Sequence, residues 1–541
     1  MKRSLKYSYQ CGMQGFDGSA NEFRMNPFSL KVANDIRFRG LAIIKSPGMT
    51  LFDSGAVTAT PNCLAGIDWR PTGAIQRTVT VWDNGKAYSD KTIAGDIDST
   101  TLITGLTYTS PVVLVEAGQQ AIGGDKELYI FAANNTPYKL IADGSTASAI
   151  SNISPDWTSA ANMPYAGTYH DFYLVAWGGA NARHNLYFST LEDNSDFLTN
   201  LPPVVTVAGG QGDEVRAALS LLPSRLYVWK YPVGLYWVDT TNIVNFITPI
   251  HTVRTDVGGA GPNAVCRVGS DVWFIAANGH VYSLTAAINS EDLIDADVSA
   301  DLKLTRWIEQ NISLARIKSA RIHYDDTLKE VHVYYTKAGG NHNNVGFIIN
   351  LEIPNKPRVS FETRGAYFEA VWRRLSSTNV METLSGGEGG LIYRINQEGR
   401  NLNGIAYKGE FQFPQNTLAS PTSQDPEGTN TSEPNKLFLW LDVSVIPTGN
   451  YNLIIDVYID GAYTETLDVD LGTSPATFDA STWDNAVFAQ AEGVLQRRIK
   501  MHGRGRSISL LCRNSGLNED FAISEIVLHY KLLGLKGTDN D

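Results

Sequence analysis

The sequence predicts an all-β protein in which a β-propeller is followed by a C-terminal β-sandwich. Short segments rich in aromatic and β-branched residues alternate apolar and polar side chains along most of the chain, and Gly, Asn, Asp and Pro turns separate them. Helical periodicity is scarce, and the best helical candidate spans residues 295–322. The chain has 541 residues, of which 43% are hydrophobic and 18% are charged, the composition of a folded protein with two or three domains.

Strong hairpins recur at the spacing of one propeller blade. Aromatic residues hold matching places in them: Tyr129, Tyr173, Tyr227, Trp273 and Tyr334. A repeat of roughly 40 to 55 residues with about four short strands in each unit is the signature of a β-propeller. The segments 62–93 and 366–396 supply further blades, so we expect six or seven. A β-sandwich also has frequent turns, but aromatic hairpins at this spacing favour the propeller.

One hairpin carries a specific turn signal. Asn278-Gly279 stands between the apolar residues Trp273 and Ile275 on one side and Val281 and Leu284 on the other. Asn-Gly is the preferred pair for a type I′ turn, in which both central residues have positive φ. We therefore expect a tight type I′ hairpin at this position.

Composition divides the chain into three parts. Residues 1–60 form an N-terminal segment that contributes strands, residues 61–400 form the propeller, and residues 401–541 form the β-sandwich. Within the last part, residues 411–436 are rich in Pro, Ser, Thr and Asn, and we expect them to form a long exposed loop.

The charge balance argues against general capture of DNA. The formal net charge is −12, whereas a protein that binds duplex DNA through its phosphates usually carries a basic excess on the binding face. Basic residues concentrate near the C-terminus, where the arginines are Arg497, Arg498, Arg504, Arg506 and Arg513. Gly503 and Gly505 suggest a tight turn leading into a strand, with the arginine side chains directed outward. We expect these five arginines to form salt bridges or to contact a partner subunit. Nucleic acid is the weaker alternative, because aromatic residues that could stack on bases are missing from this stretch.

Signals for chemistry are weak. The four cysteines are far apart and form no CxxC pair, so we expect reduced thiols, with neither a disulfide framework nor a zinc site. The nine histidines form no HExxH motif, and the Gly-rich runs lack the Lys-Ser/Thr of a phosphate loop. No apolar run approaches the roughly 18 residues that cross a bilayer, and the first residues do not resemble a secretion signal. We therefore expect no catalytic residue, no cofactor, no metal and no membrane segment.

Three segments in the same order resemble one family. Residues 26–48, 255–284 and 502–537 are similar to the opening motif, a propeller blade and the closing module of the tail nozzle or tail hub (tail tubular) proteins of short-tailed bacteriophages. In the first segment, the matching positions are Pro27, Leu30, Ala33, Asn34, Gly40, Pro47 and Gly48. Lys45 and Ser46 stand where the family more often has Arg-Pro or Arg-Ala.

The resemblance implies a structural virion protein of the phage tail without enzymatic activity. Such proteins form homo-oligomeric rings, typically hexamers, below the portal–adaptor (head–tail connector) complex. The ring extends the DNA exit channel and closes it until DNA ejection, and the genomic DNA passes through without specific binding. The implied partners are further copies of the chain, the portal–adaptor proteins and tail fibre proteins. The protein would be made in the host bacterial cytoplasm and located in the virion tail, with residues 1–60 contacting the adaptor platform.

The alternative is a receptor- or carbohydrate-binding tail protein. Propellers and β-sandwiches both present loops suited to glycans. The aromatic residues Trp229, Tyr231, Tyr236 and Trp237 could stack on sugars, although a packed blade explains them equally well. A propeller glycoside hydrolase is a third hypothesis, but no carboxylate pair stands out among the acidic residues.

Overall fold

The structure is a computed structural model. It describes the following parts of the chain: residues 5–19, 22, 25–53, 55–72, 74–92, 95–109, 111–118, 126–140, 146–191, 193–199, 203–208, 213–245, 248–353, 356–364, 368–418, 435–472 and 494–533. Strands dominate these residues, as the sequence predicts. None of the helices in these ranges is long and apolar enough to cross a membrane.

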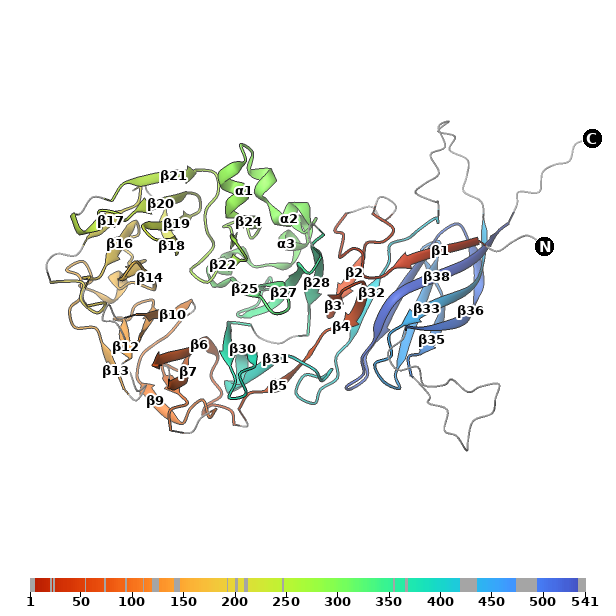
Figure 1. The fold of residues 1–541 in the computed structure, drawn as a ribbon, viewed down its shortest axis with the longest axis horizontal. Helices are drawn as coiled ribbons and strands as arrows, with labels where there is room; N and C mark the ends of the chain where they lie inside the picture. The colour runs from red at the N-terminus through yellow and green to blue at the C-terminus, as the bar shows by residue number, and fades with distance from the viewer. Residues whose placement is uncertain are drawn as a thin grey trace, which may run out of the picture.

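The central part of the chain is a β-propeller, a succession of antiparallel sheets that follow one another around a ring (Figure 1). The first three sheets contain the strands β6 (Cys63–Thr72), β7 (Ile75–Trp82), β8 (Ala87–Ser89) and β9 (Thr100–Ile103); β10 (Val112–Ala117), β11 (Glu127–Ala132), β12 (Tyr138–Leu140) and β13 (Ala147–Ala149); and β14 (Ala166–His170), β15 (Tyr173–Trp177), β16 (Asn185–Phe188) and β17 (Val204–Thr206).

The ring continues with sheets of similar design. Their strands are β18 (Glu214–Leu222), β19 (Arg225–Tyr231), β20 (Leu235–Asp239) and β21 (Ile250–Arg254); β22 (Val265–Val268), β23 (Asp271–Ile275) and β24 (Val281–Ser283); β25 (Arg321–Asp325), β26 (Glu330–Thr336), β27 (Asn343–Asn350) and β28 (Arg358–Glu362); and β29 (Ala370–Leu375), β30 (Met381–Gly386) and β31 (Ile392–Gln397).

The recurring aromatic residues mark equivalent strands. The five that the sequence aligned lie in β11, β15, β19, β23 and β26, and each of these is the second strand of its sheet. In this place a strand has neighbours on both sides, so a bulky aromatic residue is covered from two directions. Tyr129 and Tyr334, for example, are almost completely buried. The repeat that the sequence predicts is therefore a repeat of sheets.

The last sheet of the ring is completed by a strand from the other end of the chain. β5 (Gly48–Leu51) pairs antiparallel with β31, and Leu51 lies opposite Tyr393. Met49 of β5 is buried in a cluster with Tyr334 and Phe368. Because β5 lies just before β6 in the sequence, this pairing joins the beginning of the propeller chain to its last sheet.

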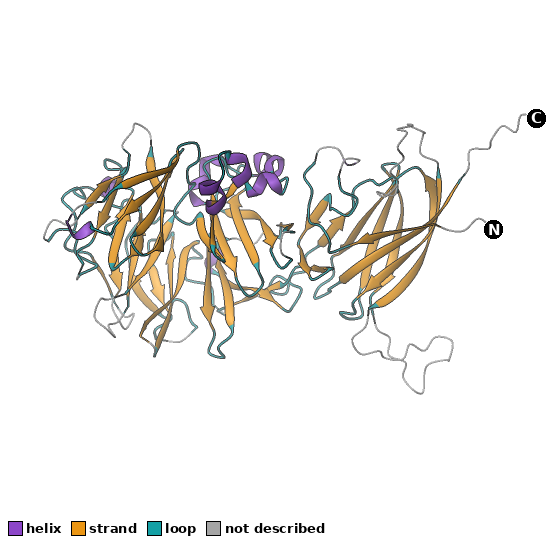
Figure 2. Ribbon diagram, turned by 45° about the horizontal axis from the view of Figure 1, so that its top comes forward, coloured by secondary structure: helices purple, strands orange, loops and turns teal. Residues whose placement is uncertain are grey.

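Two local predictions are wrong. Instead of one helix over residues 295–322, short helical turns follow β24: α1 (Leu284–Asn289), η4 (Leu293–Ala296), α2 (Val298–Asp301), α3 (Thr305–Asn311) and η5 (Leu314–Ser319). Lys303 has a φ of 56° between α2 and α3, which ends α2, and β25 begins at Arg321. Figure 2 shows these helices gathered on one side of the propeller.

The second wrong prediction is the type of turn at Asn278-Gly279. A hairpin does join β23 and β24, and Gly279 has a φ of 86°, but Asn278 is not among the residues with positive φ. The Asn278 side chain instead accepts a hydrogen bond from the backbone N–H of His280 at 3.0 Å. The loop is one residue longer than a type I′ hairpin: the N–H of Gly279 donates to the carbonyl of Ala276 at 2.9 Å, and the N–H of Ala276 donates to the carbonyl of His280 at 2.8 Å. A three-residue loop of this kind needs only one left-handed residue, which is Gly279.

The C-terminal part is built from two sheets that share one core. One contains β1 (Leu5–Gln10), β3 (Ile36–Arg39), β4 (Ala42–Lys45), β33 (Lys436–Val445), β36 (Leu495–Gly505) and β38 (Ala522–Leu532). The other contains β34 (Asn452–Ile459), β35 (Ala462–Asp470) and β37 (Ile508–Asn514). Alternate residues of both, such as Leu441, Val443, Ile455 and Leu510, form one buried apolar cluster.

A single sheet connects the propeller to the C-terminal part. β2 (Val32–Asn34) lies beside β28 of the propeller and pairs on its other side with β32 (Gly409–Gln412), which continues to β37, β34 and β35. Figure 1 shows β2, β3 and β4 between the two parts. The prediction of an exposed loop over residues 411–436 is wrong at its start, because Phe411 and Phe413 are buried in the C-terminal core. Most of that stretch, residues 419–434, lies outside the described residues.

Candidate functional site

The region where residues 12–47 run between the propeller and the C-terminal sheets is called the joint here. At its centre, Arg37 of β3 reaches into the propeller and pairs with Glu362 of β28, with 2.8 Å between Nη2 and Oε2. The Nε of Arg37 also lies 3.6 Å from Oε2 of Glu330 on β26. All three side chains are 1% exposed or less, so this is a desolvated ion cluster and not a surface salt bridge.

A second arginine and an aspartate extend the cluster. Arg364 forms ion pairs with Glu362 and, at 3.7 Å, with Asp35. The backbone N–H and the hydroxyl of Thr363 donate to the Asp35 carboxylate at 2.8 and 2.6 Å. Burial and the neighbouring Glu362 nevertheless raise the pKa of Asp35 to about 7. Burial acts in the same direction on Glu362, but Arg364 and Arg37 outweigh it and lower its pKa to about 2.

Arg358 fixes the N-terminal chain from the propeller side. Its Nη1 donates to the carbonyl of Gly12 at 2.8 Å, and its Nη2 donates to Oδ1 of Asn350 at 2.6 Å. The amide nitrogen of Asn350 in turn donates to the carbonyl of Phe38 at 3.2 Å. Sheet pairing, ion pairs and these backbone contacts act on the same short segment, so the joint is held firmly on both sides.

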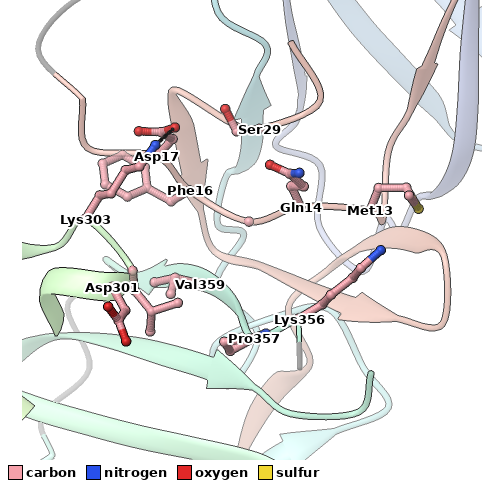
Figure 3. Close-up of a pocket in the computed structure, with 12 residues that line it drawn as sticks. Met13, Gln14, Phe16, Asp17, Ser29, Asp301, Lys303, Lys356, Pro357 and Val359 are labelled. Atoms are coloured by element: carbon pink, nitrogen blue, oxygen red, sulfur yellow. Dashed lines mark hydrogen bonds and ion pairs between the residues drawn. The ribbon is translucent and has the colours of Figure 1, made fainter. Parts of the chain in front are cut away.

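A small pocket lies at the edge of the joint (Figure 3). Its volume is about 220 Å³, and its walls come from residues 13–17, Ser29, the end of α2 and residues 356–359. Nζ of Lys303 pairs with Asp17 at 2.6 Å, and Ser19 also donates to that carboxylate. The Asp17 charge is therefore used to attach the N-terminal loop to the propeller. This pocket brings together no nucleophile with a general base.

The five arginines predicted as partner contacts have different environments. Arg498 makes a two-pronged ion pair with Asp442, at 2.6 and 2.9 Å, and Arg513 pairs with Asp456 at 2.7 Å. Arg497 donates to the carbonyl of Asp470 at 3.0 Å and to that of Gly472. Arg504 and Arg506 are exposed, and neither side chain forms an ion pair with any residue that the structure describes. Arg498 and Arg513 thus make the expected salt bridges within their own chain.

The predicted turn around Gly503 and Gly505 is in the wrong place. Both glycines belong to β36, and the turn follows at Arg506 and Ser507, whose backbone N–H groups donate to Asp460 at 2.9 Å. A Cβ on either glycine would overlap the side chain of Ile459 in the facing sheet. The glycines are therefore needed for close packing of the two sheets and not for a bend.

The outer side of β36 forms a second surface, called the β36 face here. Arg498, Lys500, His502 and Arg504 are exposed at every second position of the strand. Beside them on β33 lie Leu437, Leu439 and Trp440. These three residues, together with Arg498, Lys500 and His502, line a groove of about 600 Å³, and Arg504 follows at its end. The basic alternation was visible in the sequence. The apolar wall was not, because β33 is about 60 residues away in the chain.

Intramolecular contacts engage the whole aromatic set proposed for sugar stacking, including Tyr236, whose ring centre lies 5.9 Å from Nζ of Lys230. Trp229 is fully buried. Trp237 is stacked against His251 with the ring centres 3.9 Å apart, and the Arg225 guanidinium lies 4.7 Å from its centre. Arg216 covers Tyr231 at 4.3 Å. The observation that favoured carbohydrate binding therefore has a structural explanation, the internal packing of the propeller.

The remaining candidates for chemistry are few. All four cysteines are unpaired, and burial raises the pKa of Cys266 and of the other three thiols. Three acidic side chains could together hold a metal ion. In the part of the chain that the structure describes, Asp53, Asp96 and Asp98 are the one group of three His, Cys, Asp or Glu residues whose possible ligand atoms lie within 4.8 Å of one another. Asp53 already accepts hydrogen bonds from the backbone of Gly55 and Ile97. The sequence could not indicate this group, because Asp53 lies more than 40 residues before Asp96 and Asp98.

Comparisons with known proteins give distant likenesses. No family model and no curated protein matches the chain. Among solved structures, YCF48 bound to D1 peptide is similar with 11% identity and a TM-score of 0.36, over 63% of this chain and 94% of that one. PorZ, a surface component of the type-IX secretion system of Porphyromonas gingivalis, is similar with 15% identity and a TM-score of 0.37, over 64% of this chain and 38% of PorZ. The propeller of this chain is defined by the pairing of its own strands.

Proposed function

We propose that this protein is a structural subunit of the tail of a short-tailed bacteriophage, where a ring of copies forms the nozzle that extends and closes the DNA exit channel. In this proposal each subunit has a propeller of six or seven blades over residues 61–400, completed by β5, and a β-sandwich over residues 401–541, completed by β1, β3 and β4. The N-terminal residues 1–60 contact the portal–adaptor complex, and the ring is a hexamer.

The observation that carries the proposal is the position of the segments that resemble the nozzle family. The opening motif and the closing module are almost 500 residues apart in the chain, yet β4 of the first pairs with β38 of the second. Nζ of Lys45 also donates to Oδ1 of Asn514 at 3.0 Å and to the carbonyl of Gly516 at 3.2 Å. The opening motif and the closing module are therefore in contact in the folded chain, which supports the proposal that they act as one structural unit.

The extensive contacts at the joint support a role in which the subunit resists mechanical force. One continuous sheet crosses from the propeller to the C-terminal part, and a buried ion cluster lies on it. Enzymes that close two domains around a substrate usually need a hinge of a few residues with little buried contact. A subunit of a channel wall needs the opposite, because it must keep its shape while DNA moves past.

The charge of the chain agrees with this role. A net charge of −12 repels phosphate groups and lets DNA pass without being captured. The glycan-binding alternative loses its main support because the aromatic faces are occupied within the propeller. We therefore put forward the nozzle function alone.

Immunogold labelling of intact phage particles, viewed by negative-stain electron microscopy, tests the proposal. Gold at the distal centre of a short tail is the expected result. Gold on peripheral fibres would transfer the protein to receptor binding, and particles without label would exclude a place in the virion. Labelling with antibodies to the major capsid protein controls for access of the gold to the particles.

A further inference from the structure

We propose that the β36 face of one copy binds the η4 segment of a second copy of this chain, in a head-to-tail contact. The η4 segment is defined here as residues 290–296. The inference deepens the proposed function, since it names the surfaces by which ring subunits would meet. It combines a basic, partly apolar groove with an acidic, apolar-tipped segment on the opposite part of the molecule.

The groove offers both attraction and an apolar seat. Lys500 lies opposite Trp440 in the pairing of β36 with β33, and Arg504 lies opposite Leu437. Leu437 is 37% exposed although it lies in the middle of a sheet. Its neighbour Leu439 lines the same groove. An apolar wall of this kind on an outer sheet face gains free energy when another apolar side chain covers it.

The positive charge of the face is only partly neutralised within the chain. Arg498 is engaged by Asp442, and His502 lies 3.6 Å from Glu465. Lys500 and Arg504 form no ion pair with the residues that the structure describes. The chain has a net charge of −12, so another copy of it offers acidic residues to which this basic stripe is complementary.

The groove does not suit nucleic acid. Arg498 lies 5.2 Å from the centre of the Trp440 ring, and His529 stacks on the same side chain with centres 4.7 Å apart. With these neighbours packed on it, Trp440 cannot serve as a platform for bases, which single-strand binding usually requires. The leucine wall matches an aliphatic side chain between carboxylates better than it matches a sugar–phosphate backbone.

The η4 segment has the complementary features. Ile294 is 68% exposed and lies between the acidic residues Glu291 and Asp295. Neither carboxylate forms an ion pair among the described residues, whereas Asp292 is used to cap η4 through the backbone N–H of Ile294. The segment is also held in shape, because Nη1 of Arg254 donates to the carbonyls of Ser290 and Glu291 at 2.9 and 3.2 Å. Such order reduces the entropy lost on binding.

The location of the two surfaces makes the contact intermolecular. η4 follows α1 on the propeller, and β36 lies on the far side of the C-terminal part (Figure 1). A contact between two different patches is heterologous, and its repetition generates a closed ring or an open filament. Each copy then presents one groove and one acidic segment, as a ring requires.

A charge-swap experiment on the full chain tests the contact. The first variant, K500E/R504E, makes the groove acidic, and the second, E291K/D295K, makes the η4 segment basic. Each variant alone places like charges against each other, and we expect its association constant to fall at least about tenfold in sedimentation velocity at low salt. In an equimolar mixture, every contact between two different variants joins an acidic surface to a basic one. The mixture should therefore recover assembly, with the two variants alternating. K329E/K337E, which changes the charge by the same amount on exposed propeller residues, should behave as wild type.

Zero-length carbodiimide cross-linking adds a positional readout. In a mixture of light and heavy isotope-labelled wild-type protein, Lys500 should be joined to Glu291 or Asp295 between a light and a heavy chain. Assembly that persists in both single variants would overturn this contact and leave the nozzle function standing. A wild-type chain that remains monomeric at every concentration would also overturn it, and the gold labelling would then decide on the nozzle function separately. Recovery in the mixture shows at the same time that both variants are folded.

Discussion

Arg37 and Glu362 form an ion pair 2.8 Å long at the joint between the propeller and the C-terminal part, and each side chain is 1% exposed. The two residues are 325 positions apart in the chain. Because both charges are desolvated, each depends on the other and on the surrounding groups, Glu330 and Arg364. This cluster and the sheet that crosses the joint hold the two parts of the molecule together.

Removal of one charge from this pair should destabilise the protein strongly. In Arg37→Ala, the carboxylates of Glu362 and Glu330 lose a buried partner, and we expect a loss of about 3–5 kcal/mol in the free energy of unfolding. Urea denaturation followed by tryptophan fluorescence measures it. Arg504→Ala is the matched control, since Arg504 is exposed and its removal should change stability by less than about 0.5 kcal/mol. Equal effects of the two substitutions would show that the cluster does not support the joint.

The stability of the joint should depend on pH through Asp35. Its pKa rises from the ordinary 3.8 to about 7 on folding. The folded protein thus holds this proton more tightly than the unfolded chain does. The contribution of Asp35 is complete below about pH 3.8 and is lost as the pH rises to 7.

Melting temperatures of the wild type and of Asp35→Asn between pH 4 and 8 check this dependence. Asparagine is the suitable replacement, because the backbone of Asp35 has a φ of 51° and asparagine tolerates this conformation. The wild type should lose stability relative to the variant as the pH rises from 4 to 7. Parallel curves for the two proteins would mean that Asp35 does not titrate in this range.

The glycines of β36 should tolerate no side chain. Gly505→Val forces a branched side chain against Ile459 of the facing sheet, and we expect a cost of about 1–3 kcal/mol from overpacking. Thermal unfolding measures the change. Gly118→Ala is the control, since a Cβ at that glycine meets only the Tyr169 ring at ordinary contact distance. If the clash is the cause, the second change Ile459→Ala should recover part of the loss caused by Gly505→Val.

Closure of the propeller by β5 should be important for its stability. Met49 is 2% exposed and packs with Tyr334 and Phe368, so Met49→Ala leaves a cavity at the point where the ring closes. We expect a loss of about 2–5 kcal/mol and faster proteolysis within the propeller. The exposed Met381 provides the control, and Met381→Ala should leave both measurements unchanged. A Met49→Ala protein as stable as the wild type would indicate that the packing of this side chain does not contribute to closure of the ring.

The propeller could be predicted from the sequence because its signals are local. Most sheets of the propeller are made of consecutive strands, so Tyr173 or Trp273 marks a hairpin whose partners lie within a few tens of residues. The turn at Asn278 shows the limit of this approach, because the residue pair predicts a hairpin but does not fix whether its loop has two or three residues.

The joint and the β36 face could not be predicted in the same way. The partners of Arg37 lie on β26 and β28, and the apolar wall beside Lys500 comes from β33. These contacts depend on the tertiary arrangement, and neither spacing nor composition encodes it. The sequence left salt bridges and partner contacts open for Arg498 and Arg513, and it did not indicate that Asp442 and Asp456 would pair with them.

The pairing of β1 with β38 has a consequence for biosynthesis. Leu5 lies opposite Tyr530, so β1 leaves the ribosome long before β38 and must wait for it before it can be paired. β4 waits for β38 in the same way, and β5 waits for β31. Such long-range pairing slows folding and leaves strand edges open in the growing chain. The nascent polypeptide can therefore build individual sheets of the propeller during translation, but the ring closes only after β31 has been synthesised, and the pairing of β4 at the joint only after β38.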